Sequence, residues 1–362
     1  MIEYENLSRA NEPFRKEFVE SFRSMLKKGW FILGEQVGKF EEEFADYCGV
    51  NYCVGVASGF DALMLSLRAL RLERNAEVIV PSNSYVATIL AVLQVGLKPV
   101  LVEPDPATYN IDPDQIEERI SRKTRVILPV HLYGKPCSMD RLVALSKRHK
   151  LHIIEDCAQA HGAKFGRRMV GSFGRLSAFS FYPTKNLGAL GDGGAVVTND
   201  AELAREVRRL RNYGSEKKYD SSVVGVNSRL DEIQAGFLRI KLRKLDRING
   251  HKRSLARVYQ SGLNDSVVKP VVRPDEHDVF HIYAIRHPKR DKLRAYLLKH
   301  GIKTEIHYPV PPHHQQSVRD LFAGESYPLS EEIHRTILSL PISVFHKRKD
   351  ISKVIDVLND FE

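Results

Sequence analysis

Cysteine is scarce in this sequence and is not arranged for metal or redox chemistry. The 362 residues contain four cysteines, and no two of them are spaced as C-x-x-C. So few cysteines in a chain of this length do not form a disulfide scaffold, and the missing C-x-x-C spacing argues against a zinc ribbon and a thioredoxin-type site. A reducing compartment, the cytoplasm, is therefore the expected location.

A secretory leader and a long apolar run are also missing. The opening segment, MIEYENLSRANEPF, carries acidic residues and no apolar core, unlike a signal peptide. The most apolar stretch, VATILAVLQVGLKPVLV, is interrupted by Gln94, Gly96 and the Lys98–Pro99 pair, so it is too broken to span a bilayer. We expect a buried helix that stops at Gly96, then a strand, and no membrane partner.

Acidic residues are outnumbered by basic ones. The sequence has 55 Lys and Arg against 45 Asp and Glu, a formal net charge of +10. The basic residues gather in REVRRLRNYGSEKKY and in RIKLRKLDRINGHKR, where Ile240, Leu242, Leu245 and Ile248 are apolar. This spacing favours a helix with a solvated basic face over a nucleic-acid surface, so we expect no nucleic-acid partner. A phosphorylated small substrate would also favour positive potential.

What the sequence does have is a regular alternation of strand-like and helical segments over its first 245 residues. This pattern predicts an α/β fold with a mostly parallel sheet covered by helices on both faces. The alternation fades near residue 235, so we predict a large domain over 1–245 and a smaller α+β domain over 246–362. The predicted strands are YCVGVAS, EVIVPS, KPVLVEPD, TRVILPVHLYG and the start of LHIIEDCAQAHGA; the predicted helices are EEEFADYCGV, GFDALMLSLRAL, YVATILAVLQVG, DPDQIEERIS and SMDRLVALSKRHK.

Asp156 follows the apolar residues of the strand LHIIED, near its carboxyl end. Open α/β sheets bind ligands at this edge, and a carboxylate there needs a positive partner, either a metal or a protonated heterocycle. Glu155 is the nearest acid, but neighbours along a strand point to opposite faces, so this pair is not expected to share a metal. Alone, Asp156 fits a helix cap or a structural ion pair equally well.

Lys185 follows Asp156 in the stretch FSFYPTKNLGALGDGGA. A protonated lysine is a poor nucleophile, and burial among Phe179, Phe181 and Tyr182 would lower its pKa. Such a lysine can form a Schiff base with an aldehyde. Pyridoxal phosphate is an aldehyde that also needs an acid at its ring nitrogen. Lys185 and Asp156 fill these two roles, so the pair indicates pyridoxal phosphate as cofactor.

A seat for the cofactor phosphate is predicted where Ser58 and Gly59 turn a strand into a helix, because free N–H groups at a helix start favour an anion. The hydroxyl of Ser180 could add a contact. Tyr85, also at a helix start, could lie flat on the cofactor ring, with core packing as the equal alternative. The glycines of the run 188–194 follow a lysine turn and lead into a strand, which is unlike a dinucleotide fingerprint and argues against a nicotinamide oxidoreductase.

Seven motifs in order along the chain resemble the sugar aminotransferases named after DegT, DnrJ, EryC1 and StrS. They are ASGFDAL, PSNSYVAT, IIEDCAQAHGA, FSFYPTKNLGALGDGGA, NYGS, NSRLDEIQA and HYPVPPHHQ. The resemblance covers essentially the whole chain. It implies the aspartate aminotransferase type of fold (fold type I), pyridoxal phosphate, a cytoplasmic location and a homodimer with active sites at its interface.

The resemblance also implies roles for individual residues. Lys185 matches the lysine that bonds the cofactor, and Asp156 matches the acid at the ring nitrogen. Asn227 of NSRLDE resembles a residue that the neighbouring subunit contributes to the phosphate site. The remaining implied contacts are Gln159 near the ring hydroxyl, Tyr85 on the ring, Gly59, Phe60 and Ser180 at the phosphate, and Tyr182, His307 and Tyr308 at the substrate.

The run after the lysine indicates the substrate. The sequence LGDGG at 190–194 looks like the branch acting on nucleotide-linked 3-keto-6-deoxyhexoses, whereas the branch aminating C4 usually has a run like TTGEGG. Lys185 also argues against the dehydratase members, in which histidine replaces this lysine. The resemblance therefore implies transfer of an amino group from L-glutamate to C3 of a dTDP-linked keto sugar, for polysaccharide or natural-product glycan synthesis. Amination at C4, or of a UDP-linked 3-keto sugar, stays open.

Two further interpretations are a metal site in a histidine-rich loop and a non-catalytic regulator. In EIHYPVPPHHQ, His307, His313 and His314 could suggest a metal, but no carboxylate or cysteine lies among them and the prolines favour a rigid loop, so no metal is expected. The alternative role for His307 and Tyr308 is only to shape the domain junction. A non-catalytic pyridoxal-binding regulator would usually carry a helix-turn-helix domain, and the chain has no spare segment for one.

Overall fold

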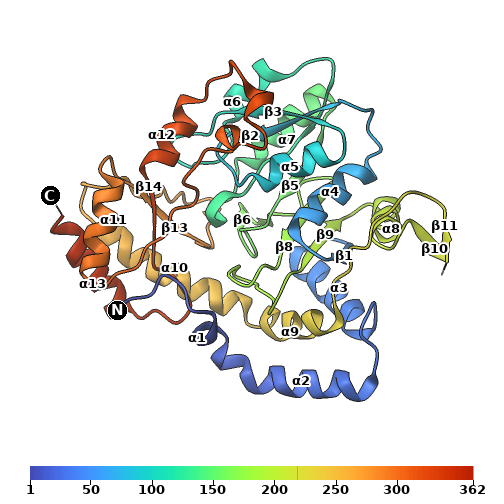
Figure 1. Cartoon of the computed structure of the whole chain (residues 1–362), viewed down its shortest axis with the longest axis horizontal. Coiled ribbons are helices and arrows are strands. Elements are labelled where there is room, and N and C mark those ends of the chain that lie inside the picture. Colours follow the sequence, from blue (N-terminus) through green and yellow to red (C-terminus); the bar gives the residue numbers. More distant parts are fainter. Residues whose placement is uncertain (218, 362) are drawn as a thin grey trace.

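A seven-stranded mixed sheet forms the centre of the computed structural model, which describes residues 1–217 and 219–361 (Figure 1). The strand order is β1-β9-β8-β5-β4-β2-β3, and β9 is antiparallel to both of its neighbours while the other pairs are parallel. The strands are β1 (Tyr52–Val56), β2 (Glu77–Pro81), β3 (Lys98–Val102), β4 (Thr124–Ile127), β5 (His152–Asp156), β8 (Leu176–Ser180) and β9 (Gly194–Thr198).

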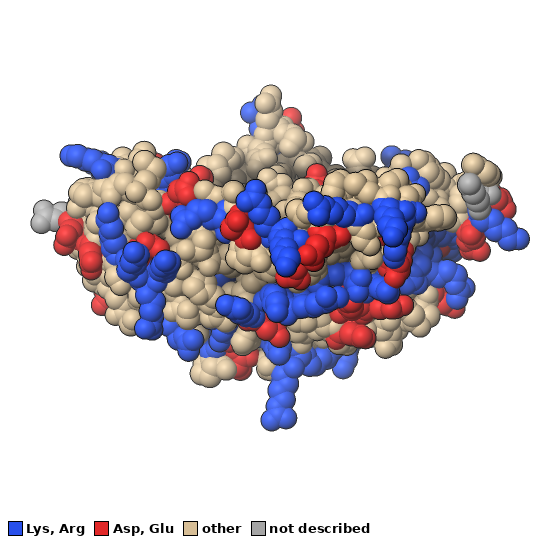
Figure 2. Space-filling model, turned by 90° about the horizontal axis from the view of Figure 1, so that it is seen from below, with Lys and Arg blue, Asp and Glu red and all other residues tan. Residues whose placement is uncertain are grey.

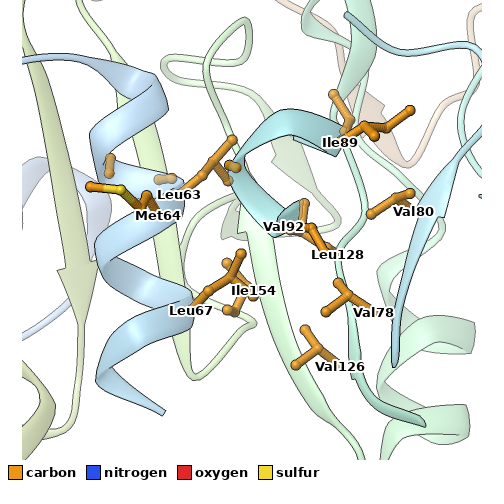
Figure 3. Close-up of a cluster of buried hydrophobic side chains, with 14 of the residues drawn as sticks. Leu63, Met64, Leu67, Val78, Val80, Ile89, Val92, Val126, Leu128 and Ile154 are labelled. Atoms are coloured by element: carbon orange, nitrogen blue, oxygen red, sulfur yellow. The ribbon is translucent and has the colours of Figure 1, made fainter. Parts of the chain in front are cut away.

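Helices cover both faces of this sheet because its strands alternate apolar side chains between the two faces. On one face Val78 and Val80 pack with Leu63, Leu67 and other residues of α4, α5 and α8, as Figure 3 shows for part of this cluster. Ile79, between the two valines, packs on the other face with α7. The helices of this region are α1 (Leu7–Asn11), α2 (Arg15–Lys28), α3 (Glu35–Cys48), α4 (Gly59–Ala69), α5 (Ala87–Gln94), α6 (Pro113–Ile116), α7 (Met139–His149), α8 (Ala201–Leu210) and α9 (Glu232–Leu242), with 3-10 turns at Glu12–Phe14, Glu117–Arg119 and Leu132–Gly134.

The predicted α/β class and the helix-covered, mostly parallel sheet are confirmed. Two predicted elements are shorter than expected. The stretch TRVILPVHLYG is a strand only over β4, and its next residues include Pro129, which has no N–H to donate to a sheet. The stretch DPDQIEERIS forms the single turn α6 and then a 3-10 turn.

Three small strand groups of the described residues lie outside the main sheet: β6 (Lys164–Phe165), β7 (Arg168–Met169) and β12 (Glu276–His277); β10 (Ser215–Lys217) and β11 (Asp220–Ser221); β13 (Tyr283–Arg286) and β14 (Ile337–Leu340).

The C-terminal part is built around the antiparallel pair β13 and β14. The helix α10 (Leu245–Gly262) joins it to the rest of the chain: Leu245 packs in a cluster with α3 and α9, while Tyr259 packs near the other end of the helix with Tyr283. We propose the domain boundary between 245 and 246, at the start of this helix. The other elements here are α11 (Arg290–Lys299), α12 (Pro328–Thr336) and α13 (Arg348–Asn359), with 3-10 turns at Pro312–His314 and Arg319–Phe322.

The first residues of the chain pack against this C-terminal part. Ile2 forms a parallel bridge with Ile302, and its N–H donates to the carbonyl of Gly301 at 2.7 Å. Its side chain belongs to the same buried cluster as β13 and β14. Nε2 of His346 lies 2.8 Å from the Glu3 carbonyl oxygen. Residues 1–5 therefore lie beside residues that are roughly 300 positions away in the sequence (Figure 1).

On the face of the molecule shown in Figure 2, Lys and Arg side chains are interspersed with Asp and Glu. The second basic run forms two helices, α9 and α10, and its four apolar positions are buried as expected. Its basic face is not fully solvated, however, because Lys241 and Lys252 are only 6% and 5% exposed. Within residues 1–217 and 219–361, no helix has both the length and the apolar composition needed to cross a bilayer.

Candidate active site

Asp156 lies at the carboxyl end of β5, with its side chain buried. Its two carboxylate oxygens accept hydrogen bonds from the Thr88 hydroxyl at 3.0 Å and from the Ala158 N–H at 3.1 Å. Burial raises the pKa of the Asp156 carboxyl, and these two donors and the charge of Lys185 act against that rise. The site thus holds one acid close enough to a lysine for their charges to interact, at the edge where the sequence predicted a ligand.

Glu155 points to the opposite face of the same strand, as expected from strand geometry. Its carboxylate is fully buried and accepts hydrogen bonds from three backbone N–H groups and the Ser177 hydroxyl, and it lies 3.0 Å from Nε2 of His131. Burial raises the pKa of Glu155, but the contact with His131 and the backbone donors outweigh it and leave the pKa below its ordinary value. We infer that Glu155 is a structural acid, because both of its carboxylate oxygens are already engaged by backbone N–H groups, Ser177 and His131.

Lys185 lies in the turn after β8, where its N–H donates to the Tyr182 carbonyl at 2.9 Å. Burial lowers the pKa of the Lys185 amine to about 8, with the charge of Asp156 opposing the shift. The expected cause of this burial is only partly right. Tyr182 is 53% exposed, and Phe179 and Phe181 pack against Phe44 at ring distances of 5.0 and 5.3 Å, in a hydrophobic cluster beneath the sheet.

Two histidines that were not predicted from the sequence, His161 and His281, have pKa values that respond to Lys185. Burial, and then the charge of Lys185, lower the pKa of His161 to about 3 and that of His281 well below its ordinary value, so both rings are uncharged at neutral pH. Three ring nitrogens, both of His161 and Nδ1 of His281, are buried without a hydrogen-bond partner among the described residues. A histidine inside the apolar stretches CAQAHGA and VFHIYAI is the signal that could have identified them.

Two buried lysines, also missed, hold the chain just after Lys185. Nζ of Lys241 donates to the Gly188 carbonyl at 2.6 Å, and Nζ of Lys252 donates to the Asn186 side chain at 3.0 Å. Burial lowers the pKa of each lysine to about 8. A lowered lysine pKa therefore does not by itself single out Lys185; its distinguishing feature is that the charge of Asp156 acts on it.

The first turn of α4 packs closely against the end of β8 and the start of β9. A Cβ atom on Gly59 would lie 2.5 Å from Cβ of Ser180, and one on Gly194 would lie 2.3 Å from the Ser58 carbonyl oxygen. Only glycine allows these approaches. The Ser58 hydroxyl caps the Asp61 N–H at 3.1 Å, while the N–H groups of Gly59 and Phe60 have no partner within the helix. Such a helix start suits a phosphate.

Gln159, Tyr308 and Tyr85 form a connected group. Nε2 of Gln159 donates to the Tyr308 hydroxyl at 3.0 Å, while its Oε1 accepts from the Tyr133 N–H at 2.7 Å. The rings of Tyr308 and Tyr85 are 5.0 Å apart at an angle of 33°. Tyr85 is 51% exposed, so it is not a core residue and its ring is available to a ligand.

His307 lies beside this group and is also held in place. Its Nδ1 is 2.9 Å from the Ser339 hydroxyl, and its carbonyl accepts a hydrogen bond from the Tyr133 hydroxyl. Burial, and then the charge of Lys185, lower the pKa of His307 to about 4. The charge of Lys185 therefore acts on His307, although His307 belongs to the C-terminal part of the chain.

Within the described residues, the Asn227 side chain has no hydrogen bond to any of the other predicted site residues. Its side chain is exposed, and Nδ2 donates to the Tyr213 hydroxyl at 2.9 Å. The next residue, Ser228, donates to the Asp61 carboxylate at 2.7 Å, which ties this segment to the start of α4. An exposed position is what a contribution to a second subunit requires, so that role stays a proposal.

Comparison with known proteins identifies the relatives of this arrangement. The DegT/DnrJ/EryC1/StrS aminotransferase family profile matches residues 13–359. The dTDP-3-amino-3,6-dideoxy-alpha-D-galactopyranose transaminase of Aneurinibacillus thermoaerophilus is 48% identical over 362 residues, covering 100% of this chain and 99% of the relative. The dTDP-3-amino-3,4,6-trideoxy-alpha-D-glucose transaminase of Streptomyces venezuelae is 46% identical, covering 99% and 96%.

Solved structures agree with these relatives and with the expected aminotransferase fold. The structure of DesV from S. venezuelae, solved with a ketimine intermediate, superposes with a TM-score of 0.97 at 46% identity, covering 99% of this chain and 98% of that chain. NtdA from Bacillus subtilis, solved with bound cofactor PMP, superposes with a TM-score of 0.93 at 30% identity, covering 99% and 85%.

Proposed function

The chain belongs to the DegT/DnrJ/EryC1/StrS aminotransferase family, and on this premise we propose that it moves an amino group from L-glutamate to C3 of a dTDP-linked 3-keto-6-deoxyhexose. The product would be a dTDP-3-amino-3,6-dideoxyhexose. The observation that carries the proposal is the full-length similarity to two transaminases whose names specify dTDP-linked 3-amino sugars. We propose a cytoplasmic location because all four cysteines are free and buried.

Pyridoxal phosphate fits the residues that are present. We propose that Lys185 holds its aldehyde carbon, that Asp156 bonds its ring nitrogen, and that the first turn of α4 receives its phosphate together with Ser180. Tyr85 would cover one face of the ring and Gln159 would lie at the ring hydroxyl. Gly59 and Gly194 support the phosphate assignment, because side chains there would collide with Ser180 and Ser58 and displace the helix start from the end of β8. When bound, the cofactor supplies an electron sink for the bond that breaks.

The residues of the chain then divide the work. Asp156 would keep a proton on the heterocyclic nitrogen, since within the described residues its buried carboxylate accepts hydrogen bonds only from two neutral groups, the Thr88 hydroxyl and the Ala158 N–H. Lys185, once free, takes the proton from the α-carbon of the amino donor through Nζ, and in the second half-reaction it delivers a proton to C3 of the sugar. An amine with a pKa of about 8 can both accept and release a proton near neutral pH. Tyr182, His307 and Tyr308 would contact the substrate.

The position of amination tests the proposed function directly. We expect the enzyme, given L-glutamate and a dTDP-linked 3-keto-6-deoxyhexose, to form a product whose NMR spectrum places nitrogen on C3. The matched control is the dTDP-linked 4-keto sugar, which should not be aminated. Nitrogen on C4, or a preference for the UDP-linked 3-keto sugar over the dTDP-linked one, would replace the proposal by one of its alternatives.

The rate at which the cofactor-free protein combines with pyridoxal phosphate is expected to rise with pH up to about 8 and then to level off. Only the uncharged amine attacks the aldehyde, and burial lowers the pKa of Lys185 to about 8. Below that value the uncharged fraction rises about tenfold per pH unit. The growth of the near-visible absorption band measures the rate. A rate that continues to rise up to about pH 10, the ordinary range of lysine, would contradict a buried amine.

We propose a homodimer because one face of the protein exposes a contiguous group of apolar side chains. On α2, Val19 and Phe22 line a groove with Leu190 of the glycine-rich run and Phe237 of α9. Large exposed apolar groups of this kind mark protein interfaces. A second copy of the chain is the proposed occupant, since Leu190 lies five residues after Lys185 and the shared active site would lie nearby. Leu26, Trp30, Phe31 and Ile32 extend the exposed apolar surface.

A mixture of two inactive variants is expected to regain activity if Asn227 acts across the dimer. In a mixed dimer of Lys185→Ala and Asn227→Ala subunits, one site combines an intact Lys185 with the partner's intact Asn227. Co-expressed variants should therefore recover activity that neither variant has alone, with up to one intact site in each mixed dimer. Activity is measured as release of 2-oxoglutarate. No recovery in proven mixed dimers would place Asn227 at the site of its own subunit.

A further inference from the structure

The loop after Tyr308 and the helix α12 bring together three groups that bind metals in other proteins. His313 and His314 lie in the 3-10 turn Pro312–His314, and Glu331 lies in the first turn of α12. Oε1 of Glu331 is 3.3 Å from Nε2 of His313 and 3.6 Å from Nε2 of His314. Sequence analysis expected no metal here because no carboxylate lies among the histidines in the sequence. The fold brings a carboxylate, that of Glu331, to the histidines from 17 residues after His314 in the sequence.

The separations match those of ligands around one tetrahedral ion. Zinc bonds histidine nitrogen and carboxylate oxygen at about 2.0–2.1 Å, so ligand atoms of a tetrahedral site lie about 3.3 Å apart. The nitrogen–oxygen distances, 3.3 Å for His313 and 3.6 Å for His314, are close to this value, and all three ligand atoms lie within 4.8 Å of one another. The prolines at 311 and 312 restrict the loop, which reduces the entropy lost on binding.

The three groups have few other partners within the described residues. The Glu331 carboxylate contacts His313 and His314, and no other side-chain partner of it is found there. His313 is only 3% exposed, and its Nε2, the atom that would bind the ion, faces the Glu331 carboxylate. His314 and Glu331 are partly exposed, so an ion could reach them from solvent. The proposed transamination uses none of these groups.

We propose that His313, His314 and Glu331 form a binding site for a late first-row divalent cation, with Zn²⁺ as the first candidate and water in the fourth position. Two imidazoles and one carboxylate suit Zn²⁺, Co²⁺, Ni²⁺ and Cu²⁺ and do not suit Mg²⁺ or Ca²⁺, which prefer oxygen ligands. A bound ion would join the loop to α12. The same helix carries His334, whose Nδ1 lies 2.7 Å from the Tyr308 carbonyl oxygen, so the ion would lie at a structural junction near the active site.

Zinc titration of the untagged holoenzyme, after treatment with a chelator, tests the site. We expect one Zn²⁺ per chain by calorimetry, and an increase in Tm on addition of Zn²⁺ because the ion binds the folded state. His314→Ala and Glu331→Gln should each weaken binding by about tenfold or more. His300→Ala is the matched control, since His300 is an exposed histidine on the end of α11, and it should bind as the unaltered protein does.

The outcomes separate cleanly from those of the proposed function, because binding and Tm are measured without substrate. Equal affinity in His314→Ala and His300→Ala would place the ion elsewhere and overturn the site. Absence of binding to the unaltered protein at micromolar Zn²⁺ would do the same. Binding of Mg²⁺ as tight as that of Zn²⁺ would overturn the assignment of the cation class.

Discussion

Replacing Lys185 by alanine is expected to reduce transamination by at least about 10⁴-fold, because the variant loses both the amine that bonds the cofactor and the base that moves the proton. The fold should persist, since Lys185 makes no side-chain hydrogen bond or ion pair that we find in the described residues. Activity is measured as release of 2-oxoglutarate from L-glutamate in the presence of the keto sugar. A variant that still aminates the sugar at the normal rate would remove Lys185 from the mechanism.

Borohydride reduction gives the sharper version of this experiment. It converts the bond between the cofactor and its lysine into a stable one, so peptide mass spectrometry can then locate the labelled residue. Burial lowers the pKa values of Lys185, Lys241 and Lys252 alike to about 8, so the other two lysines are internal controls. Label on Lys185 alone is the expected result. Label on Lys241 or Lys252 would show that the charge of Asp156 does not identify the lysine that bonds the cofactor.

Asp156→Asn is expected to lower kcat by about 10²–10⁴-fold while leaving the protein folded. The substitution keeps the shape of the side chain and removes the charge that holds a proton on the ring nitrogen, so the cofactor withdraws electrons less strongly. Thr88 can still donate to the remaining carbonyl oxygen. Single-turnover kinetics with L-glutamate isolate the first half-reaction, where the loss should appear. Retained kcat in Asp156→Asn would contradict the proposed role.

Glu155→Gln is the matched control for Asp156→Asn, because it makes the same chemical change at the adjacent residue. Its carboxylate lies on the opposite face of β5 and accepts from the N–H groups of Gly171, Phe173 and Gly174. A glutamine side chain keeps one accepting oxygen and replaces the other by an NH2 group that cannot accept, so at least one of these bonds is lost, and we expect a lower Tm and nearly normal kcat in the protein that remains folded. Opposite results for the two variants, a stability loss at Asp156 and a kcat loss at Glu155, would reverse the two assignments.

The large-scale fold could be predicted because its signals are local. Buried parallel strands are short apolar runs such as EVIVP, and turn residues separate them from amphipathic helices, so the order of elements follows from periodicity alone. Strand ends were harder to place, as at Pro129, because the end depends on hydrogen bonds to another strand. The antiparallel direction of β9 is a property of the whole sheet, and no pattern within GAVVT carries it.

In the candidate site too, residues with a local sequence signal could be predicted, and residues that depend on packing could not. Lys185 and Asp156 were identified because their chemistry is unusual for their apolar neighbours in the sequence. Lys241 and Lys252 were missed because each lies in a basic stretch in which a lysine is ordinary, and only packing brings them to the turn that holds Lys185. The burial of Lys185 was predicted with the wrong neighbours, since Phe179 and Phe181 point into the hydrophobic cluster and Tyr182 points to solvent.

The bridge between Ile2 and Ile302 has a consequence for the order in which the protein assembles during synthesis. Residues 1–5 are made roughly 300 residues before their partners at Gly301 and His346. At 5–20 residues per second this interval is about 15 to 60 s. During this interval residues 1–5 lack these partners, and they can dock only after residues 301–346 have been made. Translation speed and folding of the C-terminal part are thus coupled through the first few residues.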